Sequence, residues 1–145
     1  MGRNRTTPQP QIDMPSTQEM RVIIQGDAVD SAQKTVEWAQ RLAKALKAAE
    51  LKSSQIRNVF GQVRQIEMSW PLGDEQSSYA EQAYRDLILL KPKLAYQAER
   101  VPAVVGLAEV LSAGIDLVNG NRVYFQRFVD FFEAILAYHK AEGGK

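Results

Sequence analysis

The chain has 145 residues, of which 45% are apolar and 24% charged, the size and composition of a single globular domain. It contains no cysteine, which excludes disulfides, thiolate metal sites and cysteine nucleophiles, and which fits a reducing cytoplasm. The net charge is only +1, so any binding to nucleic acid has to come from local clusters of charge.

Residues 1–26 are rich in Thr, Gln, Pro and Arg. Because Pro8, Pro10 and Pro15 disfavour a continuous helix or regular strand pairing, we expect this segment to be a flexible N-terminal leader. Its short apolar patch, Val22–Ile24, could dock onto the core. The prediction is therefore a leader over residues 1–26 and one helical domain over residues 27–145.

Two helices are predicted in the first half of this domain. Asp27 or Asp30 can cap a helix that runs to about Glu50 and is rich in Ala, Leu, Lys and Gln, which are strong helix formers. Ser53 or Ser54 can cap the next one, which ends at Trp70-Pro71. Its apolar side chains recur every three or four residues, the pattern of one buried face, at Ile56, Val59, Phe60, Val63 and Ile66.

The next two predicted helices are shorter. Asp74 or Ser77 begins a helix that ends near Leu90 in a run of large aliphatic residues. Pro92 can then occupy the first position of a short helix, where its missing N–H costs nothing.

Pro102 has the same role at the start of a further helix, which stops at Asn119-Gly120. This segment contains Glu109 and Asp116 as well as the proline, so we expect a buried helix and no membrane span. Asn121 caps the last helix, which runs to about Ala141. With no convincing strand pattern, the sequence predicts an all-α fold, a compact bundle of five to six helices.

Charge is unevenly distributed along these helices. Residues 41–64 carry six cations against one glutamate, whereas residues 65–90 carry five carboxylates against one arginine. This arrangement is typical of a protein that meets an anion on one side and a basic partner on the other, although two ordinary solvated faces would produce the same pattern.

The sequence offers little for catalysis or for binding a metal or cofactor. His139 is the only histidine, and one histidine without cysteine cannot form an ordinary zinc site. The glycines are scattered singly, so there is no glycine-rich phosphate loop. We therefore predict no catalytic residue, no metal site and no cofactor, and a protein that is not an enzyme.

The helix predicted after Ser53 carries Arg57, Gly61 and Arg64 on one stripe, because their spacing is four and three. Two guanidinium groups with a side-chain-free notch between them could bind the phosphates of a closely approaching strand, with Asn58 and Gln62 adding hydrogen bonds. On spacing alone, the better interpretation is that the arginines are solvated or paired with carboxylates and that Gly61 permits close helix packing.

A second stripe lies on the short helix that follows, at Lys93, Tyr96 and Arg100, with Lys91 just before it. A ring between two cations suits a nucleotide, since the ring can stack on a base while the charges bind phosphate. A half-buried tyrosine with surrounding cations is the alternative.

The last helix has an apolar arc too wide for one core face. Part of this apolar arc should be core, and we expect the rest of it to contact another copy or subunit rather than nucleobases. The residues predicted for this protein interface are Tyr124, Phe128, Phe131 and Phe132.

Two short sequence words point to a family. Residues 53–57 (SSQIR) followed by Val59-Phe60, and residues 87–100 (LILLKPKLAYQAER), resemble the small subunit of type III-A CRISPR–Cas complexes, the Csm complexes. The resemblance extends over about residues 27–141 in length, helix order and the Asn-Gly stop before an aromatic closing helix.

The resemblance implies a non-catalytic subunit, present in several copies, that binds the backbone of crRNA and target RNA without sequence specificity. Its partners would be the backbone subunit, the large subunit and other copies of itself. By this resemblance the RNA-binding residues are Arg57 and Arg64 in the first word's helix, and Lys91, Lys93, Tyr96 and Arg100 in the second. Glu99 departs from the small or neutral residue expected beside Arg100. The alternatives are the small subunit of a type III-B complex and a helical protein-interaction module without RNA binding.

Overall fold

A computed structural model describes residues 13–73 and 77–145, and within them every regular element is helical. The all-α prediction is confirmed. The elements in chain order are α1 (Thr17–Gln25), α2 (Ala28–Ala48), α3 (Ser53–Ser69), α4 (Ser78–Ile88), α5 (Leu90–Arg100), the short 3₁₀ helix η1 (Pro102–Val104), α6 (Val105–Asp116) and α7 (Arg122–Ala141).

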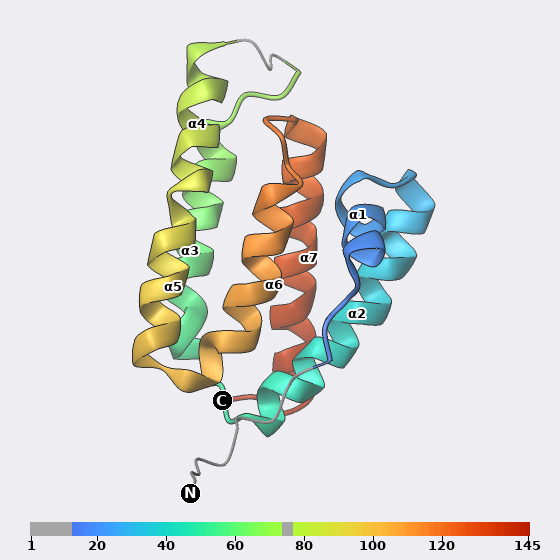
Figure 1. Ribbon diagram of the computed structural model, residues 1–145, viewed down its shortest axis with the longest axis vertical. Helices are drawn as coiled ribbons and strands as arrows, with labels where there is room; N and C mark the ends of the chain where they lie inside the picture. The colour runs from blue at the N-terminus through green and yellow to red at the C-terminus, as the bar shows by residue number, and fades with distance from the viewer. Residues whose placement is uncertain (1–12, 74–76) are drawn as a thin grey trace, which may run out of the picture.

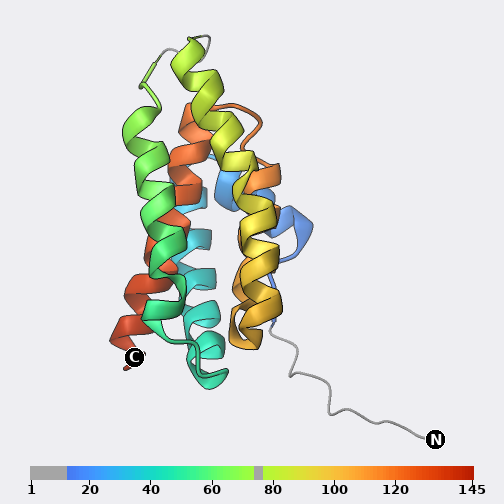
Figure 2. The same cartoon turned by 90° about the vertical axis from the view of Figure 1, so that its left-hand side faces the viewer.

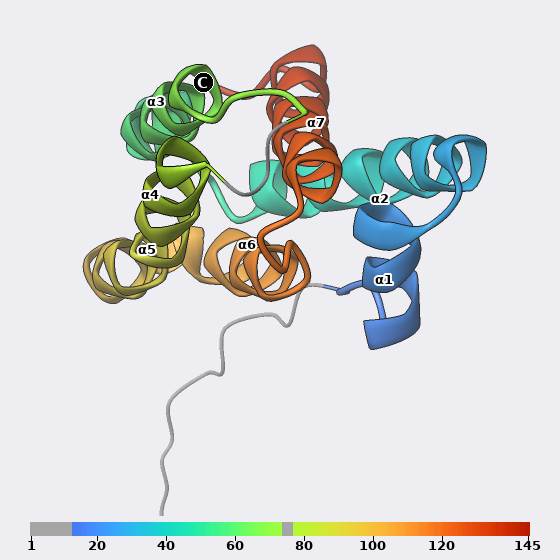
Figure 3. The same cartoon turned by 90° about the horizontal axis from the view of Figure 1, so that it is seen from above.

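The helices form two layers (Figures 1 and 3). Seen from above in Figure 3, α3, α7 and α2 lie in one layer, and α4 with α5, α6 and α1 lie in the other. The closing helix α7 packs against α2, α3, α1 and α6, so it is enclosed on most sides. At one edge of the molecule α3 lies beside α4 and α5, and at the opposite edge α1 lies against α2.

Several predicted caps are present. Ser77 precedes α4 and its Oγ accepts a hydrogen bond from the N–H of Ala80, and Asn121 precedes α7 and accepts one from the N–H of Tyr124. Before α7, Asn119 (φ 53°) and Gly120 (φ 70°) are both left-handed, which is the conformation that an Asn-Gly pair favours. The alternative cap at position 74 lies outside the described residues.

Other helix boundaries differ from the predictions by a few residues. The residue that precedes α3 is Lys52, whose N–H donates to Gln55 Oε1 (2.8 Å), and Ser53 is already helical. Pro92 is the third residue of α5, still within the first turn, where backbone N–H groups have no partner in the helix. Pro102 begins η1, and α6 ends at Asp116.

Residues 17–25 form helix α1, so the prediction of a flexible leader is wrong for this segment. A capping box begins the helix, because Ser16 and Glu19 each accept a hydrogen bond from the other's backbone N–H. Met20, Ile23 and Ile24 are fully buried against the rest of the bundle. The last proline before this helix is at position 15, so none interrupts residues 17–25. Burial of the short apolar face provides the free energy that an isolated nine-residue helix lacks. Residues 1–12 lie outside the described residues.

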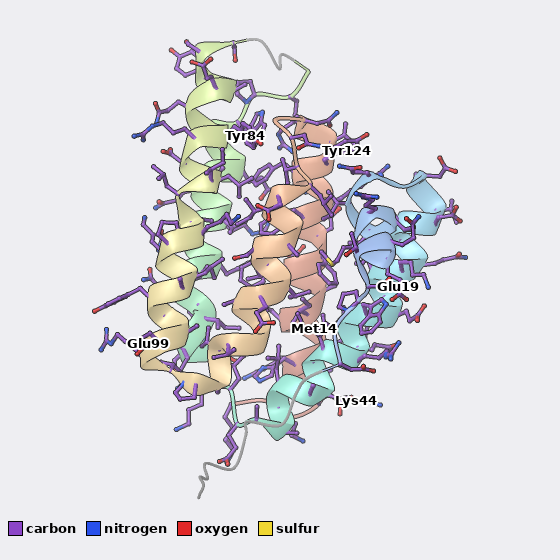
Figure 4. The ribbon with its side chains drawn as sticks, in the orientation of Figure 1. Met14, Glu19, Lys44, Tyr84, Glu99 and Tyr124 are labelled. Atoms are coloured by element: carbon purple, nitrogen blue, oxygen red, sulfur yellow. The ribbon has the colours of Figure 1, made fainter. Side chains whose placement is uncertain are left out.

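The wide apolar arc of α7 is core, and the predicted protein interface at Phe128, Phe131 and Phe132 is wrong. All three side chains are at most 1% exposed. Phe132 meets the ring of Phe60 edge-on, with 5.0 Å between centroids. Tyr124 is only partly buried, near the upper end of α7 in Figure 4, and packs against the same core. Because helices pack on α7 from both layers, an arc too wide for one core face is still covered.

Candidate nucleic-acid interface

Helices α3 and α5, which carry the two predicted stripes, run antiparallel to each other at one edge of the molecule (Figure 2). Lys93 Nζ donates to Gln62 Oε1 (2.9 Å), and Gln97 Nε2 donates to the backbone carbonyl of Gln55 (2.8 Å). These two hydrogen bonds tie the helices together at points about two turns apart along α3 and one turn apart along α5. We refer to the outer surface of α3 and α5 at this edge as the α3–α5 face.

The first stripe is divided by ion pairing. Arg57 is exposed and makes no hydrogen bond or ion pair with any described residue. Arg64, two turns further along the same stripe, reaches toward α7: it pairs with Glu67 (2.8 Å) and with Glu133, and its guanidinium lies 5.0 Å from the centre of the Phe60 ring. Arg64 is therefore already neutralised, as the interpretation from spacing anticipated, and Arg57 is the free cation of this stripe.

The electrostatics of this pair follow from its geometry. Hydrogen bonding to Glu67 raises the pKa of Arg64, and the charge of Glu133 adds to this effect. Burial raises the pKa of the Glu67 carboxyl, but hydrogen bonds from Arg64 and Gln126 outweigh it, so that the pKa is lowered overall. Both partners thus remain charged at neutral pH, and Arg64 has no unsatisfied preference for phosphate.

Gly61 lies at the open surface of α3. A Cβ placed on it would meet no atom within 4 Å, so this glycine does not serve close helix packing. In the middle of an exposed helix a glycine costs stability relative to alanine, and nothing within the described residues compensates for this cost. The position leaves open space on the surface of α3 one turn beyond Arg57.

The second stripe is largely solvent-facing. Tyr96 is 64% exposed, which rules out the half-buried tyrosine considered from the sequence, and the Arg100 guanidinium lies 5.6 Å from the centre of its ring. Lys93 donates to the neutral amide of Gln62 and has no carboxylate partner among the described residues. Lys91 instead points to the other side of α5, where it pairs with Asp116 of α6. Of the predicted cations, Lys93 and Arg100 on α5 and Arg57 on the exposed side of α3 are the ones without a carboxylate partner among the described residues.

A shallow groove continues this face toward α4. Its polar lining includes Gln62, Gln65 and Ser69 from α3 together with Lys93 from α5, while Asp86 marks its far end. Amides and hydroxyls in such a groove can hydrogen-bond ribose or phosphate oxygens of any sequence. Gln65 was not predicted from the sequence, although its spacing of three from Gln62 places it about one turn further along α3.

Groups that could support catalysis are not gathered at this face. Within residues 13–73 and 77–145 there is no group of three His, Cys, Asp or Glu side chains that could hold a metal ion. His139 is buried, with Nε2 2.9 Å from the carbonyl oxygen of Leu51. In the same part of the chain, none of the helices is long and apolar enough to cross a membrane.

Fold and surface together define a small, all-helical protein with a face of cations, neutral amides and one exposed aromatic ring. Residues 29–145 match the family described as Csm2 Type III-A, and the chain belongs to this family. It is thus a small subunit of a type III-A CRISPR complex, as the two sequence words had suggested. No curated protein and no solved structure shows a significant match.

Proposed function

We propose that this chain is a non-catalytic subunit that binds the backbone of crRNA and target RNA through its α3–α5 face, without sequence specificity, and bridges neighbouring subunits in cytoplasmic antiviral defence. The observation that carries the RNA part is that Lys93 and Arg100, both without a carboxylate partner among the described residues, lie on the same stripe of α5 as the exposed ring of Tyr96, while Arg57 adds an unpaired cation on the exposed side of α3. Arg64 and Lys91 are not included in this proposal, because ion pairs occupy both.

The geometry suits a sugar–phosphate strand better than base edges. Arg57 and Arg100 can each donate two parallel hydrogen bonds to a phosphate, and the open surface at Gly61 lets a strand approach the α3 backbone. The ring of Tyr96 can stack on any base, because every base has a π-face. Sequence-independent binding is what a subunit needs if its RNA changes with each guide.

The test is RNA affinity as a function of salt. Each phosphate contact on single-stranded RNA contributes about 0.7 to the log–log slope, so Arg57→Ala combined with Arg100→Ala should reduce the slope by about 1.4. The measurement uses single-stranded RNA with the isolated chain, and then crRNA–target duplex in the reconstituted complex.

The matched control removes two exposed cations from other helices, Arg21→Ala on α1 and Lys44→Ala on α2, the latter labelled in Figure 4. It makes the same change in net charge, so a general loss of attraction would appear equally in both variants. If affinity and slope change equally in the two variants, the α3–α5 face is not the RNA site. If neither changes, the chain is a protein-interaction module without RNA binding.

A further inference from the structure

A second surface feature lies on the other side of α5, where a groove runs between α5 and α6 on the outside of the bundle. One stripe of each helix lines it, because the residues follow spacings of three and four along both. The lining is mainly small and apolar, with three carboxylates among its members: Ala95, Ala98, Glu99, Val105, Ala108, Glu109, Ser112, Ala113 and Asp116. The proposed function makes no use of this groove.

The charge of this groove is opposite to that of the α3–α5 face. Glu99 and Glu109 are exposed and have no ion-pair partner among the described residues. Asp116, at the other end, is paired with Lys91 and is still 59% exposed. Helix α5 thus has cations toward α3 and lies beside carboxylates toward α6, so the two sides attract ligands of opposite charge.

We propose that the α5–α6 groove is the docking site for a positively charged segment of a neighbouring protein subunit. This inference rests on the bridging part of the proposed function and names the surface and the chemistry of the partner. The alanines and Ser112 present little side chain, so a partner helix or strand can approach closely and bury apolar atoms. Lysines or arginines flanking that segment would then meet Glu99 and Glu109. A nucleic-acid strand is disfavoured here by like-charge repulsion.

The two surfaces can be occupied together. The edge formed by α3 and α5 faces the viewer in Figure 2, while α5 and α6 face the viewer in Figure 1, which is turned from it by 90°. Figure 4 shows Glu99 on α5 in the orientation of Figure 1. RNA on one side and a basic protein segment on the other would make α5 the helix that joins the two contacts.

The first experiment measures how firmly the chain is held in the reconstituted complex. Glu99→Gln combined with Glu109→Gln removes the unpaired charge, and Ser112→Trp fills the groove without changing charge. Each is expected to lower retention of this subunit, relative to the backbone subunit in native mass spectrometry, at least about fivefold. The control, Glu50→Gln with Glu142→Gln, changes two exposed carboxylates elsewhere and should leave retention within twofold. Full retention of both groove variants would overturn the proposal.

The second experiment identifies the neighbour. Since the chain has no cysteine, Ser112→Cys provides a single thiol for a benzophenone photo-crosslinker. Illumination of the assembled complex should join it to a protein peptide rich in Lys and Arg, whereas Gln40→Cys on the exposed side of α2 should not give that product. Crosslinks to RNA, to an acidic peptide or to nothing would refute the assignment.

The two proposals can fail separately. RNA affinity of the isolated chain is measured for every groove variant and should not fall. If the groove variants lose retention while the Arg57/Arg100 variant binds RNA normally, the docking site stands and the RNA face is wrong. If the groove variants are retained while the arginine variant loses RNA, only the docking site fails.

Discussion

Gly61 allows a prediction in which stability and RNA affinity move in opposite directions. Replacing Gly61 by Ala adds a methyl group that meets no atom within 4 Å, at a helix position whose φ is not positive. The change therefore has no steric cost and should stabilise the protein by about 1 kcal/mol, the difference in helix propensity between the two residues. For a chain of this length that corresponds to a rise in Tm of roughly 2–4 °C.

The same methyl group occupies the space beside Arg57 through which we propose that the RNA backbone approaches α3. If it costs one charge-assisted hydrogen bond, RNA affinity should fall by about tenfold or more. No general loss of structure can produce this combination, because a partly unfolded variant would lose both stability and binding. Denaturant unfolding with circular dichroism and fluorescence-anisotropy titration with RNA measure the two quantities on one sample.

A matched glycine provides the control. At Gly114, in α6, a Cβ would lie 2.9 Å from Cδ1 of the buried Phe128 ring. Gly114→Ala should therefore lower the free energy of unfolding, by up to about 2 kcal/mol, despite the same gain in propensity. Destabilisation by Gly61→Ala would contradict the open environment described for α3, and stabilisation without loss of RNA affinity would show that RNA does not use this space.

Three further predictions follow from other contacts. Hydrogen bonds from the Ser16 backbone and from the Trp38 indole lower the pKa of Glu19 from 4.5 to about 2. The contact of α1 with α2 should therefore be intact above pH 4.5 and lost as the pH falls toward 2. The Trp38 indole N–H signal in NMR measures this loss. Phe132→Ala should destabilise the fold by about 3–5 kcal/mol in denaturant unfolding without specifically weakening subunit contacts, because this side chain is core. Arg64→Ala should change RNA affinity less than twofold and stability by at most about 1 kcal/mol, since its ion pairs are partly exposed.

Each of these has a definite contrary result. A Trp38 indole signal that is unchanged down to pH 2, or one that is equally pH-dependent in Glu19→Gln, would refute the assigned pKa. A folded Phe132→Ala variant that loses only its place in the complex would restore the interface interpretation of α7. A large drop in the RNA salt slope for Arg64→Ala would mean that Arg64 exchanges its carboxylate partners for phosphate.

Local rules determined where most helices lie. The periodicity of α3, the caps at Ser77 and Asn121 and the Asn119-Gly120 stop are properties of a few adjacent residues, so they could be predicted from the sequence. The absence of cysteine and the single histidine determined equally directly which chemistry the chain lacks. The two sequence words also indicated the family to which residues 29–145 belong.

Only the tertiary structure decided which side chains are available to a partner. Arg64 pairs with its near neighbour Glu67, as local spacing allowed, but also with Glu133, 69 residues away, and Lys91 pairs with Asp116, 25 residues away. No local pattern reveals the two long-range pairings. Likewise, α1 is helical and Phe131 and Phe132 are core because other helices cover them, and burial is a property of the whole assembly of helices. The sequence by itself thus determined the helices and the kinds of residue that they carry. Packing determined that Arg57, Lys93 and Arg100 have no carboxylate partner among the described residues, since a charge stays unpaired only if no opposite charge from a distant segment reaches it.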